Sequence, residues 1–260
     1  IIAQTELEAF DAIHDMLQGN RFGNAGSLVV IEEFLAGEEA SFIVMVDGSN
    51  ILPMATSQDH KARDNGDKGP NTGGMGAYSP AAIVSPAIFD EVMDTVIKTT
   101  VDAMQSEGMP YTGFLYAGLM IDDKGKVKVL EYNCRFGDPE TQPIMMRLKS
   151  NLAKLCISAT QGTLDLAKAE WDEKTCLGVV MAANGYPEAY IKGEKIEIPD
   201  ESLDSKIFHA GTRHDKGNIY SNGGRVLCAT ALGADIKDAQ TKAYELIEKV
   251  KWEGSYYRTD

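Results

Sequence analysis

The sequence lacks several patterns that assign a chain to a common class of protein. Its 4 cysteines stand at positions 134, 156, 176 and 228, and no two of them form a Cys-x-x-Cys pair. This spacing argues against a zinc site or a redox dithiol and predicts reduced thiols. No apolar stretch approaches the ~20 residues of a membrane span, and no signal peptide opens the chain. We therefore expect a cytoplasmic protein with no membrane partner.

Positive charge is also scarce. The chain carries 25 Lys and Arg residues against 39 Asp and Glu, which gives a net charge of −14. Proteins that bind nucleic acid usually carry the opposite balance, so we expect no nucleic-acid partner. A phosphorylated small molecule stays compatible with this charge, because it needs only a local positive site. A hydrophobic content of 43% in 260 residues is ordinary for a globular chain with a sizeable core.

Two widespread phosphate-binding fingerprints are missing as well. The chain has neither G-x-x-x-x-G-K-[ST] nor a G-x-G-x-x-G that opens a helix. It also begins with Ile rather than Met, which predicts that a longer natural protein contains this chain.

Local signals predict most of the regular elements. Thr5 and Glu8 form a capping box at the start of a helix that ends at Gly19. Ser85 and Pro86 have the residue types that open a helix, and Asp235 is typical of an N-cap. Helices are predicted at residues 86–107, at 143–161 and after residue 235, and strands at 28–34, 41–46, 51–56, 111–121 and 126–133.

Residues 57–80 form a stretch with many glycines and no periodicity, which predicts a long loop. Its glycines allow backbone N–H groups to surround an anion. Lys61, Arg63 and Lys68 add a basic cluster to an otherwise acidic chain, which suits a phosphate. The alternative is a surface loop without a ligand, and a lone His60 is more often structural than catalytic.

The strongest local pattern runs from residue 131 to residue 141. On a strand, Glu131 and Asn133 share a face, and Arg135 joins them if the chain stays extended. Carboxylate and amide oxygens are the hard ligands that Mg²⁺ takes while it binds nucleotide phosphates. A guanidinium beside them can hold a transferring phosphoryl group. The alternative is a polar strand end that makes caps and surface ion pairs.

A second pattern covers residues 31–41, where an apolar run leads into acids and a glycine. Carboxylates after a strand can accept hydrogen bonds from a ribose, and free backbone groups can bind an adenine edge. The alternative is a hairpin with solvated acids. Weaker patterns lie at residues 208–213 and 222–227, where His209 or Arg225 can face a shared cleft, although a structural role is more common.

Taken together, these segments resemble the phosphoribosylamine–glycine ligase family, also called glycinamide ribonucleotide synthetases, of the ATP-grasp superfamily. The Gly-Asp-Pro-Glu-Thr-Gln run at 137–142 argues against a different ATP-grasp ligase. The resemblance covers essentially the whole chain. The similar stretches are residues 30–35, 37–42, 52–61, 69–80, 111–119, 133–143 and 222–227.

The resemblance implies an α+β fold, with an ATP-grasp core of mostly antiparallel sheet and backing helices, plus a smaller C-terminal α/β domain. Residues 1–34 would be the remnant of a small ATP-clasping subdomain, 35–170 the main ATP-grasp subdomain and 171–260 the C-terminal domain. It implies ligation of glycine to 5-phosphoribosylamine through a glycyl phosphate, with ATP and Mg²⁺ or Mn²⁺, in purine biosynthesis. We expect a monomer or a weak homo-oligomer.

The resemblance also implies roles for particular residues. Phosphoryl transfer needs positioning and charge neutralisation, and a Gly-rich lid at residues 62–76 would protect the reactive intermediate from water. The ATP-binding residues would be Glu32, Glu33, Phe34, Leu35 and Glu39, with Glu39 on the ribose. The metal ligands would be Glu131 and Asn133, the catalytic residues Arg135 and Asp138, and the substrate-binding residues Asp59, His60, Lys61, Pro139 and Glu140.

Two departures from the family pattern matter. The family has an N-terminal domain and a phosphate-clasping loop with Lys and Gly before the stretch that matches Ile1, and this chain has neither. The alternative is therefore a nucleotide-binding fragment without turnover. Many superfamily relatives place a further metal carboxylate where this chain has Gly118 and Leu119. We expect a leaner metal site, completed by phosphates and water.

Overall fold

The computed structural model describes residues 1–3, 5–19, 23–200 and 202–260. Contacts group the chain into two units, Ile1–Gly37 and Glu38–Asp260. Among the described residues, no helix combines the length and the apolar character needed to span a membrane. The predicted domain boundaries after residues 34 and 170 stay predictions.

The first unit contains α1 (Glu6–Gln18) and a short 3-10 helix, η1 (Gly23–Ser27). Thr5 caps α1 as predicted, since its Oγ1 accepts a hydrogen bond from the N–H of Glu8 at 3.2 Å. The predicted strand at residues 28–34 is wrong, because residues 28–36 form neither helix nor strand. β-branched residues favour a strand where a neighbouring strand pairs with it, and no described strand pairs with this segment.

The second unit contains a four-stranded antiparallel sheet in the order β2-β1-β7-β8. Its two turns lie where the sequence predicts them: Val46 pairs with Ile51, and Ile121 pairs with Val127. The predicted antiparallel core is thus confirmed, except for residues 28–34. The strands are β1 (Glu38–Asp47), β2 (Ile51–Pro53), β7 (Thr112–Ile121) and β8 (Val127–Asn133).

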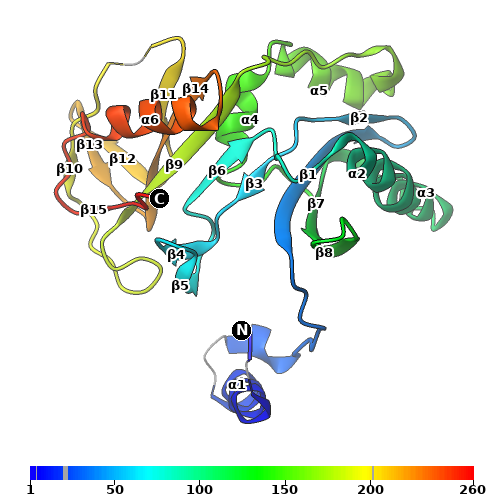
Figure 1. Ribbon diagram of the computed structural model, residues 1–260, viewed down its shortest axis with the longest axis horizontal. Helices are drawn as coiled ribbons and strands as arrows, with labels where there is room; N and C mark the ends of the chain where they lie inside the picture. The colour runs from blue at the N-terminus through cyan, green and yellow to red at the C-terminus, as the bar shows by residue number, and fades with distance from the viewer. Residues whose placement is uncertain (4, 20–22, 201) are drawn as a thin grey trace. The chain divides into compact units, whose positions relative to one another are not determined.

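Helices cover both faces of this sheet (Figure 1). Phe42 and Val44 of β1 point to one face and pack among side chains of the helical run that Ser85 caps. Ile43 and Met45 point to the other face and pack with two further helices. Burial of both faces stabilises the unit by about 25 cal/mol per Å² of apolar area. The helices are α2 (Pro86–Glu91), the π-helical segment η2 (Val92–Ile97), α3 (Lys98–Ser106), α4 (Thr141–Arg147) and α5 (Leu152–Gln161).

The single helix predicted at residues 143–161 is wrong, because the chain forms α4 and α5 with a break between them. Leu148 is extended and pairs with Trp171. The N–H of Lys149 donates to the carbonyl of Glu170 at 2.9 Å. Asn151 then caps α5 by accepting from the N–H of Lys154 at 3.1 Å. Tertiary pairing with residues 170–171 therefore overrides the helical periodicity.

A larger antiparallel sheet of the second unit has the order β11-β14-β9-β6-β3, with β15 beside β9. α6 (Ile236–Ile247) begins at its predicted cap, Asp235, and buries Ala239, Ala243 and Leu246. β10 (Lys195–Ile196), β12 (Thr212–Asp215) and β13 (Asn218–Ser221) form a separate small sheet. The large sheet's strands are β3 (Gln58–Asp59), β6 (Gly76–Ser79), β9 (Thr175–Ala183), β11 (Ser205–His209), β14 (Arg225–Gly233) and β15 (Ser255–Tyr256).

The long loop predicted at residues 57–80 is wrong, because this stretch contains four short strands. β3 and β6 belong to the large sheet, where Gly76 of β6 pairs with Val179 of β9. β4 (Ala62–Asp64) and β5 (Lys68–Asn71) pair with each other. A bridge between Ser41 and Ser57 then connects the start of β1 to the segment before β3. The two sheets therefore meet close to the first residues of β1.

Candidate active site

Polar residues occupy one face of the four-stranded sheet beside its apolar core. Ser41 of β1, Gly118 of β7 and Glu131 of β8 lie opposite one another in register. Because side chains alternate along a strand, Ser41 shares a face with Ile43, which packs near α4 and α5. A Cβ atom at residue 118 would lie 3.2 Å from Cγ of Glu131. Glycine at this position therefore leaves room for the Glu131 side chain.

Leu119, the other β7 residue noted in the sequence, lies in the core on the opposite face. β7 thus supplies no carboxylate at either of these positions, and the metal donors predicted on this sheet are those of β8.

Glu131, Asn133 and Arg135 form a hydrogen-bonded row. Nδ2 of Asn133 donates to Oε1 of Glu131 at 3.0 Å, and Nη2 of Arg135 donates to Oδ1 of Asn133 at 3.2 Å. The prediction that these three side chains lie on one side is confirmed. Glu131 and Arg135 are exposed, so a ligand can reach them.

The row offers two oxygen donors to a metal. Within the described ranges, no group of three or more His, Cys, Asp or Glu side chains is placed to hold an ion. A carboxylate beside an amide oxygen fits Mg²⁺ that keeps several waters and binds substrate phosphates, and does not form an all-protein cage. The metal-binding role of Glu131 and Asn133 stays a prediction.

Glu140 is a buried acid that connects α4 to the sheet. It directly precedes α4 and is only 2% exposed. Oγ of Ser41 donates to its Oε1 at 2.8 Å and lies 3.0 Å from the hydroxyl of Tyr116. Burial, and next the charge of Glu140, raises the pKa of Tyr116, so this hydroxyl stays protonated.

Asp59 and Lys61 lie beside this acid. Nζ of Lys61 is 3.4 Å from Oε2 of Glu39 and 3.7 Å from Oδ2 of Asp59. Burial, together with the charge of Glu140, raises the pKa of Asp59 well above 3.8, against the opposing effect of Lys61. Burial by itself lowers the pKa of Lys61, but the acids around it, Asp59 first, raise it overall. Lys61 is therefore a firmly charged cation among carboxylates.

Asp59 also carries an unpaired atom. Its Oδ1 is buried and has no hydrogen-bond partner among the described residues. A Cβ atom at residue 74 would lie 2.5 Å from this oxygen and 2.4 Å from Cδ of Pro139, and the φ of Gly74 is +112°. Glycine therefore lets the backbone close over Asp59 and Pro139.

Arg225, which the sequence left mainly as a structural residue, belongs to this cluster. Its Nη1 donates to the carbonyls of Gly73 and Asp138, both at 2.7 Å. Its Nη2 donates to Oδ2 of Asp138 at 3.3 Å. One guanidinium thus connects β14, the glycine segment and the predicted catalytic Asp138. The sequence signal was the turn Asn-Gly-Gly-Arg that ends at residue 225.

Other predicted residues lie elsewhere. His60 lines a separate pocket of ≈ 260 Å³ with Tyr78, Tyr244 and Arg258. Burial, and then the charge of Arg258, lowers the pKa of His60, which favours a neutral imidazole. The structure therefore does not bring His60 together with Asp59 and Lys61. His209 is exposed, and its Nδ1 lies 3.1 Å from Oγ1 of Thr212 on β12.

The predicted adenine-binding residues belong to the first unit. Glu32, Glu33 and Phe34 are exposed, and Leu35 is partly buried. Glu39 lies at the start of β1 in the second unit. The ATP-binding role of all five residues stays a prediction.

Comparison with known families agrees with this arrangement. Residues 1–141 match the model for the phosphoribosylglycinamide synthetase ATP-grasp (A) domain. Residues 176–260 match the phosphoribosylglycinamide synthetase C domain. The chain belongs to the phosphoribosylglycinamide synthetase family. The resemblance drawn from the sequence is thereby confirmed.

Individual relatives support the same family. A phosphoribosylamine–glycine ligase of Vibrio parahaemolyticus is 61% identical over 262 residues, which cover 100% of this chain. A crystal structure of phosphoribosylamine–glycine ligase from Thermotoga maritima has a TM-score of 0.88 and 36% identity, over 99% of this chain and 64% of the other. This chain spans 61% of the length of the Vibrio protein.

A more distant structure supports the ATP-grasp fold alone. It is the biotin carboxylase domain of a 2-oxoglutarate carboxylase from Hydrogenobacter thermophilus, solved with MgADP, ADP and bicarbonate. Its TM-score is 0.73 at 14% identity, over 97% of this chain and 54% of the other. The predicted α+β ATP-grasp fold is confirmed.

Proposed function

We propose that the full-length protein containing this chain ligates glycine to 5-phosphoribosylamine with ATP, in de novo purine biosynthesis. The products are glycinamide ribonucleotide, ADP and phosphate. The observation that carries the proposal is the hydrogen-bonded row of Glu131, Asn133 and Arg135, on an ATP-grasp sheet, in a chain of this family. The names of the Vibrio and Thermotoga relatives support the same substrates.

The proposed nucleotide site uses the exposed part of the polar face. Glu131 and Asn133 would hold Mg²⁺, or Mn²⁺, which takes similar oxygen ligands. The ion would neutralise charge on the ATP phosphates. The MgADP in the Hydrogenobacter structure supports this choice of cofactor. Arg135 donates to the Asn133 oxygen, so its guanidinium lies next to the proposed metal ligands, where it would hold a phosphoryl oxygen.

The remaining nucleotide contacts follow the family pattern. Glu39 accepts hydrogen bonds from the ribose, and the acids and backbone of residues 32–35 bind the adenine side. The contact of Glu39 with Lys61 at 3.4 Å supports a position for the ribose next to the substrate cluster.

Lys61, Arg225 and Asp138 are the proposed substrate-side groups, with Asp59, Pro139 and Glu140 packed behind them. A carboxylate oxygen of glycine attacks the γ-phosphorus of ATP, and ADP leaves. The nitrogen of phosphoribosylamine then attacks the acyl carbon, phosphate leaves and one proton is released. Lys61 attracts the anionic groups, and the exposed carboxylate of Asp138 is the proposed proton acceptor. His60 remains a candidate on the phosphoribosylamine side, from its separate pocket.

The decisive experiment measures ADP release by the full-length protein. We expect ADP to form only when ATP, Mg²⁺, glycine and phosphoribosylamine are all present. Mass spectrometry of the product should show one new amide linkage per ADP formed. Release of ADP at the same rate without glycine would exclude the ligase function.

A second candidate is a nucleotide-binding fragment without turnover, which the 61% coverage of the Vibrio protein favours for the isolated chain. Calorimetric titration of the 260-residue chain with MgATP, beside an activity assay, separates the two. We expect weak binding and little or no turnover from this chain alone. We also propose a cytoplasmic location and a monomer or weak homo-oligomer, which sedimentation of the full-length protein tests.

A further inference from the structure

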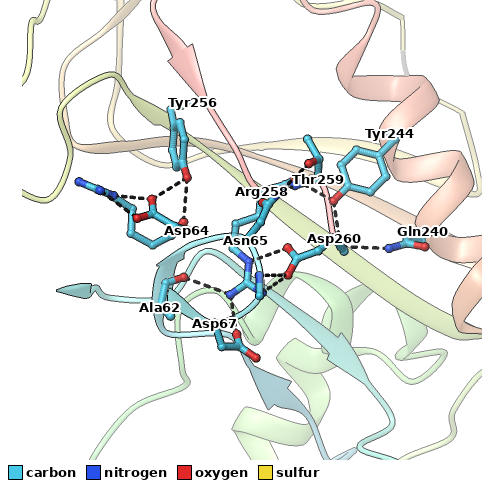
Figure 2. Close-up of polar contacts among 12 residues, drawn as sticks. Ala62, Asp64, Asn65, Asp67, Gln240, Tyr244, Tyr256, Arg258, Thr259 and Asp260 are labelled. Atoms are coloured by element: carbon cyan, nitrogen blue, oxygen red, sulfur yellow. Dashed lines mark hydrogen bonds and ion pairs between the residues drawn. The ribbon is translucent and has the colours of Figure 1, made fainter. Parts of the chain in front are cut away.

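The hairpin of β4 and β5 depends on contacts from elsewhere in the chain. Its two strands pair with each other and with no other described strand. A lone two-stranded hairpin is only marginally stable in water. Residues 256–260, here called the latch, lie against it (Figure 2). The latch therefore supplies order that the hairpin cannot supply by itself.

Arg258 is the central residue of the latch. It is only 6% exposed, and its Nη1 donates to Oδ1 of Asp67 at 2.7 Å and to the carbonyl of Ala62 at 3.1 Å. Its Nε donates to Oδ1 of Asp260 at 2.8 Å. The planar guanidinium thus contacts β4, the turn between β4 and β5, and its own segment at once.

The other latch residues form hydrogen bonds with the tip of the hairpin and with the end of β4, as Figure 2 shows. Oδ2 of Asp260 accepts from the N–H of Gly66 at 2.8 Å. Asn65 and Thr259 exchange two hydrogen bonds, at 2.6 and 3.0 Å. The hydroxyl of Tyr256 donates to Oδ1 of Asp64 at 2.9 Å.

Two side chains of α6 form hydrogen bonds with the latch. The hydroxyl of Tyr244 donates to the carbonyl of Arg258 at 2.7 Å, and Nε2 of Gln240 donates to the carbonyl of Asp260 at 3.0 Å. The latch is therefore bonded to a helix that packs on the large sheet. Through the latch, that helix also restricts the movement of the hairpin.

Both ends of the hairpin lead directly into the candidate site. Lys61 precedes β4, and its carbonyl accepts from the N–H of Thr72 just after β5, at 2.8 Å. Gly73 and Gly74 follow, and their carbonyls accept hydrogen bonds from Arg225. A fixed tip thus restricts the positions of Lys61 and of the glycine segment. These contacts favour an anchored hairpin over the mobile lid predicted for residues 62–76.

We propose that Arg258 is a positioning residue, which holds the β4–β5 hairpin so that Lys61 and residues 73–74 keep their places in the site. The kinetic part of this inference rests on the proposed function. The structural part does not, because hydrogen exchange can be measured on the 260-residue chain without turnover.

The test compares Arg258→Met with Arg213→Met, which removes an exposed arginine of β12 that pairs with Asp215 at 3.3 Å. We expect the amides of residues 62–74 to exchange at least about tenfold faster in Arg258→Met, while those of α3 and α5 keep their rates. Arg258→Lys should fall between, because an ammonium cannot make the same fork of contacts. Asp67→Asn weakens the same contact from the hairpin residue, because it removes the charge that pairs with Arg258. Asp67 is exposed, so this variant carries less risk to the fold.

Kinetics of the full-length protein give the second readout. We expect Arg258→Met to lower kcat/KM for glycine by about tenfold or more while the KM for ATP changes by less than about twofold. Unchanged exchange at residues 62–74 in both Arg258→Met and Asp67→Asn would overturn the proposal. Equal acceleration in every segment, or a loosened hairpin with unchanged glycine kinetics, would overturn it too. A full-length protein that makes no ADP would contradict the proposed function and leave the exchange result to decide the latch.

Discussion

Ser41 and Glu140 form a direct hydrogen bond of 2.8 Å between two side chains that are each 2% exposed. The bond joins the start of β1 to the residue that precedes α4, across 99 positions of sequence. It satisfies a buried carboxylate at the back of the candidate site, next to the hydroxyl of Tyr116. Removing one partner of such a bond costs more stability than the bond contributes on average, because the other partner is left buried and unpaired.

The first prediction concerns this pair. Ser41→Ala removes the hydroxyl that donates to Glu140, so we expect the free energy of unfolding to fall by about 1–3 kcal/mol. Urea unfolding followed by circular dichroism measures the change. Ser106→Ala is the control, because the hydrogen bond from the Ser106 hydroxyl to the carbonyl of Ala103, within the same helix, is exposed. A loss for Ser41→Ala no larger than for the control would show that the pair is unimportant to stability.

The second prediction uses the raised pKa of Asp59. Well below pH 3.8 this carboxyl is protonated in both the folded and the unfolded chain. As the pH rises above 3.8, the unfolded chain loses the proton first, so the folded state is progressively disfavoured until the pH passes the raised pKa. Once the pH has passed the folded pKa, each unit by which that pKa exceeds 3.8 has lowered stability by about 1.4 kcal/mol.

Asp59→Asn removes this titration. We therefore expect the variant to be more stable than the wild type at pH 8, with an advantage that shrinks as the pH falls toward 4. Urea unfolding at several pH values measures the difference, and Asp123→Asn in the β7–β8 turn is the control. An advantage that grows toward low pH would contradict the assigned direction.

The third prediction tests the metal site. Glu131→Gln keeps the size of the side chain but removes its charge. We therefore expect kcat of the full-length protein to fall, because the activation free energy rises by about 2–4 kcal/mol. The Mg²⁺ concentration for half-maximal rate should also rise. Glu253→Gln, at an exposed acid outside the site, should leave both quantities unchanged. Wild-type metal dependence in Glu131→Gln would move the metal to other residues.

Much of the fold was predictable from the sequence where the signal was local. Thr5, Ser85 and Asp235 each cap a helix through contacts within four residues, and the turns before Ile51 and Val127 fix the register of their hairpins. The strands between residues 57 and 80 were not predictable in this way. β3 has only two residues, and β6 is ordered by pairing with β9, about a hundred positions later.

The residues of the candidate site were likewise predictable only where the signal was local. Glu131 and Asn133 follow from the two-residue period of a strand, which any strand assignment supplies. Ser41 and Arg225 were not assigned to the site, because their roles depend on partners 99 and 87 positions away, Glu140 and Asp138. No local pattern contains those contacts. His60 shows the reverse case, since its neighbours Asp59 and Lys61 lie in the cluster while His60 lines another pocket.

The last prediction concerns Arg225, whose Nη1 donates to the carbonyls of Gly73 and Asp138 at 2.7 Å each and whose Nη2 donates to Oδ2 of Asp138 at 3.3 Å. Arg225→Lys keeps the charge but replaces these two nitrogens with one, so the carbonyl contacts and the contact with the Asp138 carboxylate cannot all be kept. We expect kcat/KM for glycine in the full-length protein to fall by roughly 5–150-fold, which corresponds to about 1–3 kcal/mol. Arg213→Lys on β12 is the matched control and should keep the wild-type value. Because Arg225 bonds to backbone carbonyls on the glycine segment, the variant should also accelerate hydrogen exchange at residues 73–76. If kcat/KM and exchange both stay within about twofold of wild type, Arg225 is not required to hold the site together.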